Sequence, residues 1–306
     1  MHLAGMILPI FAIILTGWLA RVSGYMPHAL APSLMQFAYY VAMPALVFLT
    51  IADESLRSLL EWRFLAAFGG GSMICFALML LGVRIGRGGN LGASAMLAAA
   101  ISMTNTGFVA LPILKALYGK PGVLAAAVAT VFVGAIMFPV LVVLLEIGRY
   151  DTSRKISVAA LIRRIVTNPV ILATLCGLLW SVGGLTLPAP FASFLTILGE
   201  ALTPCALFAI GLDLTSGELR GRVNFYAILT VIKLAIVPLV VYGLCLAMRL
   251  GHEATVAAVV CAAVPTAKSA YVLAVEYDVE KNVVGAVISM TTLLSIVTLL
   301  AWLYLL

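Results

Sequence analysis

The sequence predicts an all-α integral membrane protein with ten transmembrane helices, arranged as two inverted repeats of five. Three observations lead to this prediction: an apolar composition, ten apolar runs of membrane-spanning length, and a nearly constant offset that aligns the two halves. Of the 306 residues, 64% are hydrophobic and only 10% are charged, and the mean hydropathy is +1.18. A water-soluble surface needs about a quarter of its residues charged, so the expected solvent is the lipid bilayer.

The apolar runs follow one another along the chain, each near the roughly 20 residues that cross a bilayer. The first run, residues 1–21, has no basic stretch before it and no small-residue cleavage site, so we expect a retained span and not a signal peptide. The other runs cover residues 32–52, 64–83, 92–118, 122–147, 168–187, 193–213, 224–248, 253–277 and 282–306. Separators such as Gly119-Lys120-Pro121-Gly122 and Asn168-Pro169 hold helix-breaking residues, which supports these boundaries. Gly69-Gly70-Gly71 lies inside a run and predicts close helix packing.

The longest separator, residues 149–167, divides a first repeat (1–148) from a second (168–306), and its stretch VAALIRRIV predicts a short helix on the membrane surface. Basic residues set the orientation of membrane proteins. Loops on the side of the N-terminus hold five of them: Arg57, Arg63, Lys115, Lys120 and Arg249. The opposite loops hold eleven: Arg21, Arg84, Arg87, Arg149, Arg154, Lys155, Arg163, Arg164, Arg220, Arg222 and Lys281. We therefore expect a cytoplasmic connecting segment and both termini outside, periplasmic if the membrane is a bacterial inner membrane.

An internal repeat appears when the halves are superimposed. An offset of 160 residues pairs Ser33 with Ser193, Pro44 with Pro204, Phe48 with Phe208, and Asp53 with Asp213 at the ends of spans. An offset of 161 pairs Lys120 with Lys281 and Ala125 with Ala286. Because each half holds an odd number of spans, the second half enters the membrane the opposite way up, as in many secondary transporters.

Polar residues interrupt the fourth and ninth runs at equivalent places. The fourth contains Thr104-Asn105-Thr106-Gly107 followed by Pro112, and the ninth contains Pro265-Thr266-Ala267-Lys268-Ser269. If both helices unwind there, their half-helix ends present free N–H groups and carbonyls, an arrangement that suits a carboxylate. The candidate substrate-binding residues are Thr104, Asn105, Thr106, Gly107, Phe108, Pro265, Thr266, Lys268, Ser269 and Tyr271, with the kink prolines Pro44 and Pro204. Candidates for coupling or charge compensation are Lys268, Glu200 and Lys233.

Alternative interpretations stay open for several of these residues. Asn105 is either a ligand for substrate or an interhelical hydrogen-bonding residue, and Pro265 marks either a break or an ordinary kink. Lys268 either neutralises half-helix C-termini or attracts the anion and carries a proton, since an intramembrane charge rarely lacks a role. Glu200 pairs with Lys268 or Lys233, or lies near the outer interface. Lys233 is a further candidate for binding a carboxylate, although its run shows no break.

Several function classes lack support. The chain has no GxSxG, HExxH or paired-carboxylate motif inside a run, so an enzyme is not expected. Its net charge of +6 is unclustered, which argues against nucleic-acid binding. The five cysteines stand singly in apolar runs and are predicted to be core residues; no cofactor or metal is expected.

With these motifs in view, the sequence resembles the auxin efflux carrier family, bacterial relatives of the plant auxin exporters, within the bile/arsenite/riboflavin transporter superfamily. The resemblance runs the whole length. It is carried by PIFAIILTGWLARVSGYM at 9–26, YVAMPALVF at 40–48, NTGFVALPIL at 105–114, NPVILATLCGLLW at 168–180, LTPCALFAIGLDL at 202–214 and PTAKSAYVLAVEY at 265–277.

This resemblance implies crossed, discontinuous fourth and ninth helices. It implies a scaffold of helices 1, 2, 6 and 7, a mobile transport domain of helices 3–5 and 8–10, an elevator movement and a homodimer formed through the scaffold. It also implies organic anions as cargo, with Asn105 meeting the substrate carboxylate and Pro265 marking the second crossover. Lys268 stands where sodium-coupled relatives need oxygen ligands, so sodium coupling is not expected.

The main hypothesis is a secondary active transporter of small organic anions, either mono- or dicarboxylates or auxin-like acids, that is proton-linked or driven by the membrane potential. Its expected partners are the anion, membrane lipid and a second copy of the chain. The alternative is a monovalent cation/proton antiporter of related fold, which needs an acid at the first break, where this chain has Asn105-Thr106. A receptor without transport is a third hypothesis.

Overall fold

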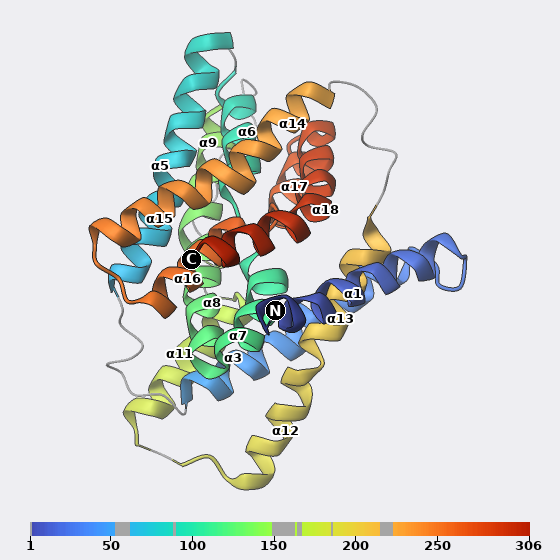
Figure 1. The fold of residues 1–306 in the computed structure, drawn as a ribbon, viewed down its shortest axis with the longest axis vertical. Helices are drawn as coiled ribbons and strands as arrows, with labels where there is room; N and C mark the ends of the chain where they lie inside the picture. Colours follow the sequence, from blue (N-terminus) through green and yellow to red (C-terminus); the bar gives the residue numbers. More distant parts are fainter. Residues whose placement is uncertain are drawn as a thin grey trace. The chain divides into compact units, whose positions relative to one another are not determined.

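The protein is helical throughout the part of the chain that the computed structural model describes, residues 2–52, 62–87, 90–148, 163, 167–184, 186–214 and 223–306. Within these residues the only strand-like pairing is an isolated antiparallel bridge between Thr104 and Thr266. Figure 1 shows this all-helical architecture. The surface helix predicted in 149–167 and the span-end residue Asp53 lie outside the described residues.

Six continuous helices are long and apolar enough to cross a membrane, which confirms an all-α membrane protein. They cover Leu30–Ala52, Trp62–Gly86, Lys120–Gly148, Ala189–Asp213, Val223–Ala247 and Lys281–Leu305. Shorter apolar helices occupy the other predicted runs. Large apolar side chains such as Leu78, Ile197 and Val297 are exposed on these helices, as expected of surfaces that contact lipid.

The chain divides into two compact units. Unit 1 comprises Met1–Trp62, Gly107–Val128 and Val166–Leu214, and unit 2 comprises Arg63–Thr106, Ala129–Ile165 and Thr215–Leu306. Unit 1 holds α1 (His2–Val22), α2 (Leu30–Phe37), η1 (Ala38–Ala42), α3 (Met43–Ala52), α7 (Leu111–Tyr118), α11 (Pro169–Val182), α12 (Ala189–Glu200) and α13 (Leu202–Asp213). Unit 2 holds α5 (Trp62–Arg87) from Arg63 on, α6 (Leu91–Ser102), η3 (Val133–Met137), α9 (Phe138–Gly148), α14 (Val223–Val231), η5 (Ile232–Ile236), α15 (Val237–Ala247), α16 (His252–Ala263), α17 (Lys268–Glu276) and α18 (Lys281–Leu305). The chain passes between the units in η2 (Thr106–Ala110) and α8 (Lys120–Phe132).

In unit 1, α1 and α13 pack backbone to backbone through two glycines. A Cβ atom added at Gly17 would lie 2.3 Å from the carbonyl oxygen of Phe208, and one added at Gly211 would lie 2.0 Å from that of Ile14. Small residues at such contacts let membrane helices approach closely.

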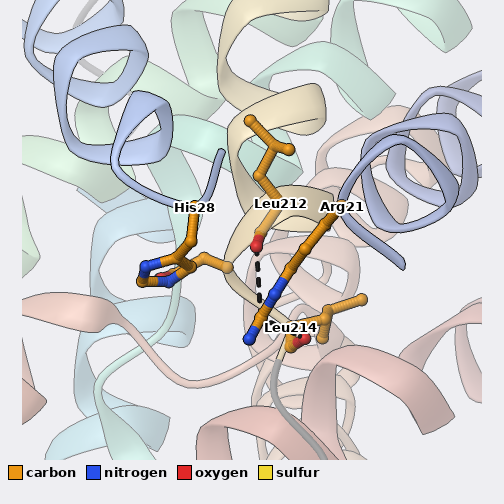
Figure 2. Close-up of polar contacts among 5 residues, drawn as sticks. Arg21, His28, Leu212 and Leu214 are labelled. Carbon is orange, nitrogen blue, oxygen red and sulfur yellow. Dashed lines mark hydrogen bonds and ion pairs between the residues drawn. The ribbon is translucent and has the colours of Figure 1, made fainter. Parts of the chain in front are cut away.

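The end of α13 is held by two side chains from the first part of the chain (Figure 2). Arg21 Nη1 donates to the carbonyl oxygens of Leu214 at 2.8 Å and Leu212 at 3.3 Å, and so satisfies groups that a helix C-terminus leaves unpaired. His28 Nε2 lies 2.8 Å from Asp213 Oδ1. The predicted position of Asp213 at a span end is confirmed.

In unit 2, two helices are buried along most of their length. Residues 94–102 of α6 and residues 255–263 of α16 are all buried, and most of them are small or apolar. A Cβ atom added at Gly69 would lie 2.6 Å from the ring of Phe132, and one added at Gly71 would lie 2.7 Å from the side chain of Val241. The close packing predicted for Gly69-Gly70-Gly71 is therefore confirmed at Gly69 and Gly71.

The prediction of core cysteines is confirmed for Cys75, Cys245 and Cys261, whereas Cys205 is only half-buried. It is wrong for Cys176, which is exposed on α11.

Four prolines explain four π-helical turns. Each of η1, η2, η3 and η5 ends just before a helix whose second residue is proline: Pro44, Pro112, Pro139 or Pro238. Proline has no N–H for the carbonyl four residues earlier, and its ring crowds that carbonyl. The chain widens there instead, so that Val237 N bonds the oxygen of Ile232, five residues back. The prediction that the 224–248 run has no break is confirmed, since Val223–Ala247 is one continuous helix, and Pro238 adds a π turn at Lys233.

Candidate substrate site at the broken helices

The helical path is interrupted in both predicted runs. α6 ends at Ser102, Met103 is extended, and η2 begins at Thr106. α16 ends at Ala263, Val264 and Ala267 are extended, and α17 begins at Lys268. The breaks are shorter than the polar patches that predicted them, since Gly107 lies within η2 while Lys268 and Ser269 open α17.

The two breaks are joined to each other by main-chain hydrogen bonds within unit 2. Asn105 N donates to the oxygen of Pro265 at 2.9 Å, and Ala267 N donates to the oxygen of Met103 at 2.9 Å. These bonds flank the bridge between Thr104 and Thr266. Non-helical backbone at membrane depth is tolerated where the protein itself satisfies its polar groups, and each break does this for the other.

Threonine side chains complete the support of the breaks. Thr266 Oγ1 donates to the oxygen of Ala100 at 2.6 Å, in the last turn of α6, while Thr266 N donates to Thr291 Oγ1 at 3.3 Å. Thr130 Oγ1 donates to Thr106 Oγ1 at 2.9 Å. Thr104 Oγ1 is buried and has no hydrogen-bond partner among the described residues. Thr104 and the buried Asn105 therefore offer polar groups beside the paired breaks.

Replacing Thr266 with valine should lower the stability of the protein, because the side chain keeps its shape but leaves the oxygen of Ala100 buried and unpaired. Such a group costs about 1–3 kcal/mol. The measurement is the apparent melting temperature of the detergent-purified protein. Thr298→Val is the matched control, since Thr298 is partly exposed on α18 and its hydroxyl donates within its own helix. Equal melting temperatures for the two variants would contradict the role assigned to Thr266.

The charged candidates lie at different ends of the broken helices. Lys268 is the first residue of α17 and so lies at a half-helix N-terminus. Lys233 lies at a half-helix C-terminus, where its Nζ donates to the oxygen of Ala262 at the end of α16. Lys268, Ser269 and Tyr271 are half-buried along the first turns of α17.

The remaining candidates belong to unit 1. The ring of Phe108 lies 6.2 Å from that of Tyr39, centroid to centroid. Pro44 is half-buried just after η1, whereas Pro204 is exposed on α13. Glu200 is the last residue of α12 and is exposed.

Three residues that support the breaks could not be recognised in this role from the sequence: Thr130, Thr291 and Lys233. Threonines inside apolar helices usually bond their own helix, so only the fold reveals that Thr130 and Thr291 also bond across helices. Among the described residues, no cluster of three His, Cys, Asp or Glu side chains could hold a metal ion.

Comparison with known proteins agrees with this architecture. Residues 2–303 match the family described as "Membrane transport protein". A protein of Rhizobium meliloti named "Putative malonate transporter" is 28% identical, with 99% of this chain and 96% of that protein covered. An "Uncharacterized transporter" of Methanothermobacter thermautotrophicus is 27% identical over 97% of this chain and 96% of its own length. The transporter YfdV of Escherichia coli, also named uncharacterized, is 23% identical over 98% and 96%. Because the family match covers nearly the whole chain, the protein is a membrane transporter of this family, as its resemblance to the auxin efflux carriers predicts, and not an enzyme.

Proposed function

We propose that the protein is a secondary active transporter of small organic anions. The observation that carries the proposal is the pair of breaks, which leaves Thr104 and Asn105 buried beside the start of α17. The first N–H groups of a helix have no partner within it, and the N-terminus is the positive end of the helix dipole. A carboxylate is the natural ligand of such an end.

The charge of Lys268 strengthens this proposal. A lysine in the first turn of a helix has the same sign as the dipole end, which is unfavourable by about 0.3–1 kcal/mol. A bound anion reverses that balance by interacting favourably with both the ammonium and the helix end. Malonate is the first substrate to test, because a relative carries that name.

We propose further that the ten predicted runs are ten spans in two inverted repeats, in a bacterial inner membrane with both termini outside. Two contacts support the alternation of spans, one in each unit. Arg21 at the end of the first run bonds Leu214 after the seventh, and Tyr277 at the end of the ninth bonds Glu146 near the end of the fifth at 2.6 Å. If successive spans cross the membrane in alternating directions, the two members of each pair lie on the same side of the membrane.

The proposed mechanism is an elevator, with unit 1 as scaffold and unit 2 as transport domain, and with a homodimer formed through the scaffold. Unit 1 contains the first, second, sixth and seventh runs, which supports this assignment. The unit boundary differs from the family expectation at Gly107–Val128, which group with unit 1.

Transport is tested by counterflow in proteoliposomes. Vesicles loaded with unlabelled malonate should accumulate labelled malonate, and other small carboxylates should compete while neutral amides should not. Separate arms impose a pH gradient, a potassium diffusion potential or a sodium gradient. We expect the first or second to drive net uptake. A failure of every mono- and dicarboxylate to exchange would refute the proposal, and proton release driven by sodium or lithium would favour the antiporter alternative.

A further inference from the structure

Lys233 is the one fully buried charged side chain among the residues that the structure describes. It lies in η5, in the middle of the continuous helix Val223–Ala247, and its Nζ donates to the oxygen of Ala262 in unit 2. An intramembrane ammonium is costly and needs a compensating group. The function proposed above does not use it.

The oxygen of Ala262, which Lys233 binds, has no helical N–H partner because α16 breaks. In a continuous helix it would accept from Thr266 N, four residues on. α16 instead ends at Ala263, and Thr266 N donates to Thr291 Oγ1. A helix C-terminus carries a partial negative charge. The break places such a charge at the end of α16, and the ammonium of Lys233 compensates it.

Local sequence fixes the lysine at this place. Pro238 forces the π turn that contains Lys233, and it also frees the oxygen of Leu234, four residues earlier. That oxygen accepts a hydrogen bond from Trp302 Nε1 of α18 at 3.0 Å. The turn is therefore held on both sides, by α16 through Lys233 and by α18 through Trp302.

The partner of Lys233 is a main-chain carbonyl oxygen and not a carboxylate. The described residues place no carboxylate within ion-pair distance of its Nζ. In transporters with broken helices, carbonyl groups at half-helix C-termini are the groups that coordinate monovalent cations.

We propose that Lys233 is a tethered cation: its ammonium occupies a latent monovalent-cation site at the C-terminal end of α16. The intact protein then needs no alkali cation at this position. Removal of the side chain should open a site that small cations with N–H donors, such as ammonium or methylammonium, can fill. The inference concerns the cation requirement of the fold and does not depend on the identity of the cargo.

The test is chemical rescue of Lys233→Ala, read as the melting temperature of the purified protein. We expect the variant to melt several degrees below the intact protein. Ammonium or methylammonium chloride should raise its melting temperature saturably, as a ligand that binds only the native state does. Tetramethylammonium chloride, at equal ionic strength, should not, because it has no N–H donor and is too large. An equal response to all three salts would overturn the proposal.

Two further variants distinguish cation binding at this site from a general effect of salt or of lost packing. Lys281→Ala removes an exposed lysine of the same unit, which bonds Asp278 at 2.7 Å, and should give no ammonium-specific response. Lys233→Met fills the space without a charge or a donor, so it should melt below the intact protein and should not be rescued. If Lys233→Met melts at the temperature of the intact protein, the proposal fails, whether or not Lys233→Ala can be purified. Because the readout is stability, this result is independent of whether malonate is transported.

Discussion

Replacing Gly211 with valine should prevent α1 and α13 from packing and so destabilise unit 1. Even one Cβ atom at this position would lie 2.0 Å from the oxygen of Ile14 and 2.9 Å from the nitrogen of Trp18, which are both backbone atoms and cannot rotate away. The helices must separate, and the contact formed through Gly17 is then lost as well. Overpacking typically costs about 1–3 kcal/mol and occasionally more, and we expect the upper end here because both neighbours are backbone atoms.

The measurement is the fraction of monodisperse protein that remains in detergent after heating. We expect Gly211→Val either to give no monodisperse protein or to lower the apparent midpoint by roughly 6–12 °C. Gly243→Val is the matched control, because a Cβ atom at Gly243 in α15 has no neighbour within 4 Å. If the two variants are equally stable, close packing at Gly211 is not what joins α1 to α13.

These glycines also mark how far the sequence can predict the packing. Gly69-Gly70-Gly71 is recognisable because three glycines inside an apolar run favour close approach of a neighbouring helix. Gly17 and Gly211 form an equally close contact, but each is a single glycine among larger residues. Only the fold, which brings together residues almost two hundred positions apart, gives them their role.

The breaks themselves can be predicted, because their causes are local. A run of Thr104, Asn105 and Thr106 competes with helical hydrogen bonding, and Pro265 lacks an N–H. What the sequence does not indicate is how the exposed backbone groups are satisfied. The bonds from Asn105 N to Pro265 and from Ala267 N to Met103 join the two halves of the chain, and main-chain partners leave no mark in the side-chain pattern.

The contact between Lys233 and the end of α16 could not be predicted from the sequence for a similar reason. Lys268 is next to the break in sequence, whereas Lys233 is about thirty residues away, in a run without a break. A π turn shifts the helical register by one residue, and no hydrophobic periodicity over a uniformly apolar run can reveal such a shift.

Replacing Asn105 with alanine should abolish most transport and leave the fold intact. Two of the bonds that hold the break survive this change, from Asn105 N to Pro265 and from Thr266 Oγ1 to Ala100, because neither uses the Asn105 amide. If that amide binds the substrate carboxylate, its loss removes a hydrogen bond to a charged group, worth about 1.5–3 kcal/mol. Malonate counterflow at low substrate concentration should fall by about tenfold to hundredfold, while the melting temperature stays within a few degrees.

This pair of measurements separates the two roles that the sequence leaves open for Asn105. A residue that only joins helices would, on replacement, lower the melting temperature first and transport as a consequence. A substrate ligand would lower transport alone, and a saturating concentration of malonate would recover part of the rate. Asn282→Ala, the same change at an exposed position of α18, should alter neither quantity. Unchanged counterflow in Asn105→Ala would show that Asn105 is not part of the site. Thr104 would then be the candidate ligand, because its buried hydroxyl has no hydrogen-bond partner among the described residues.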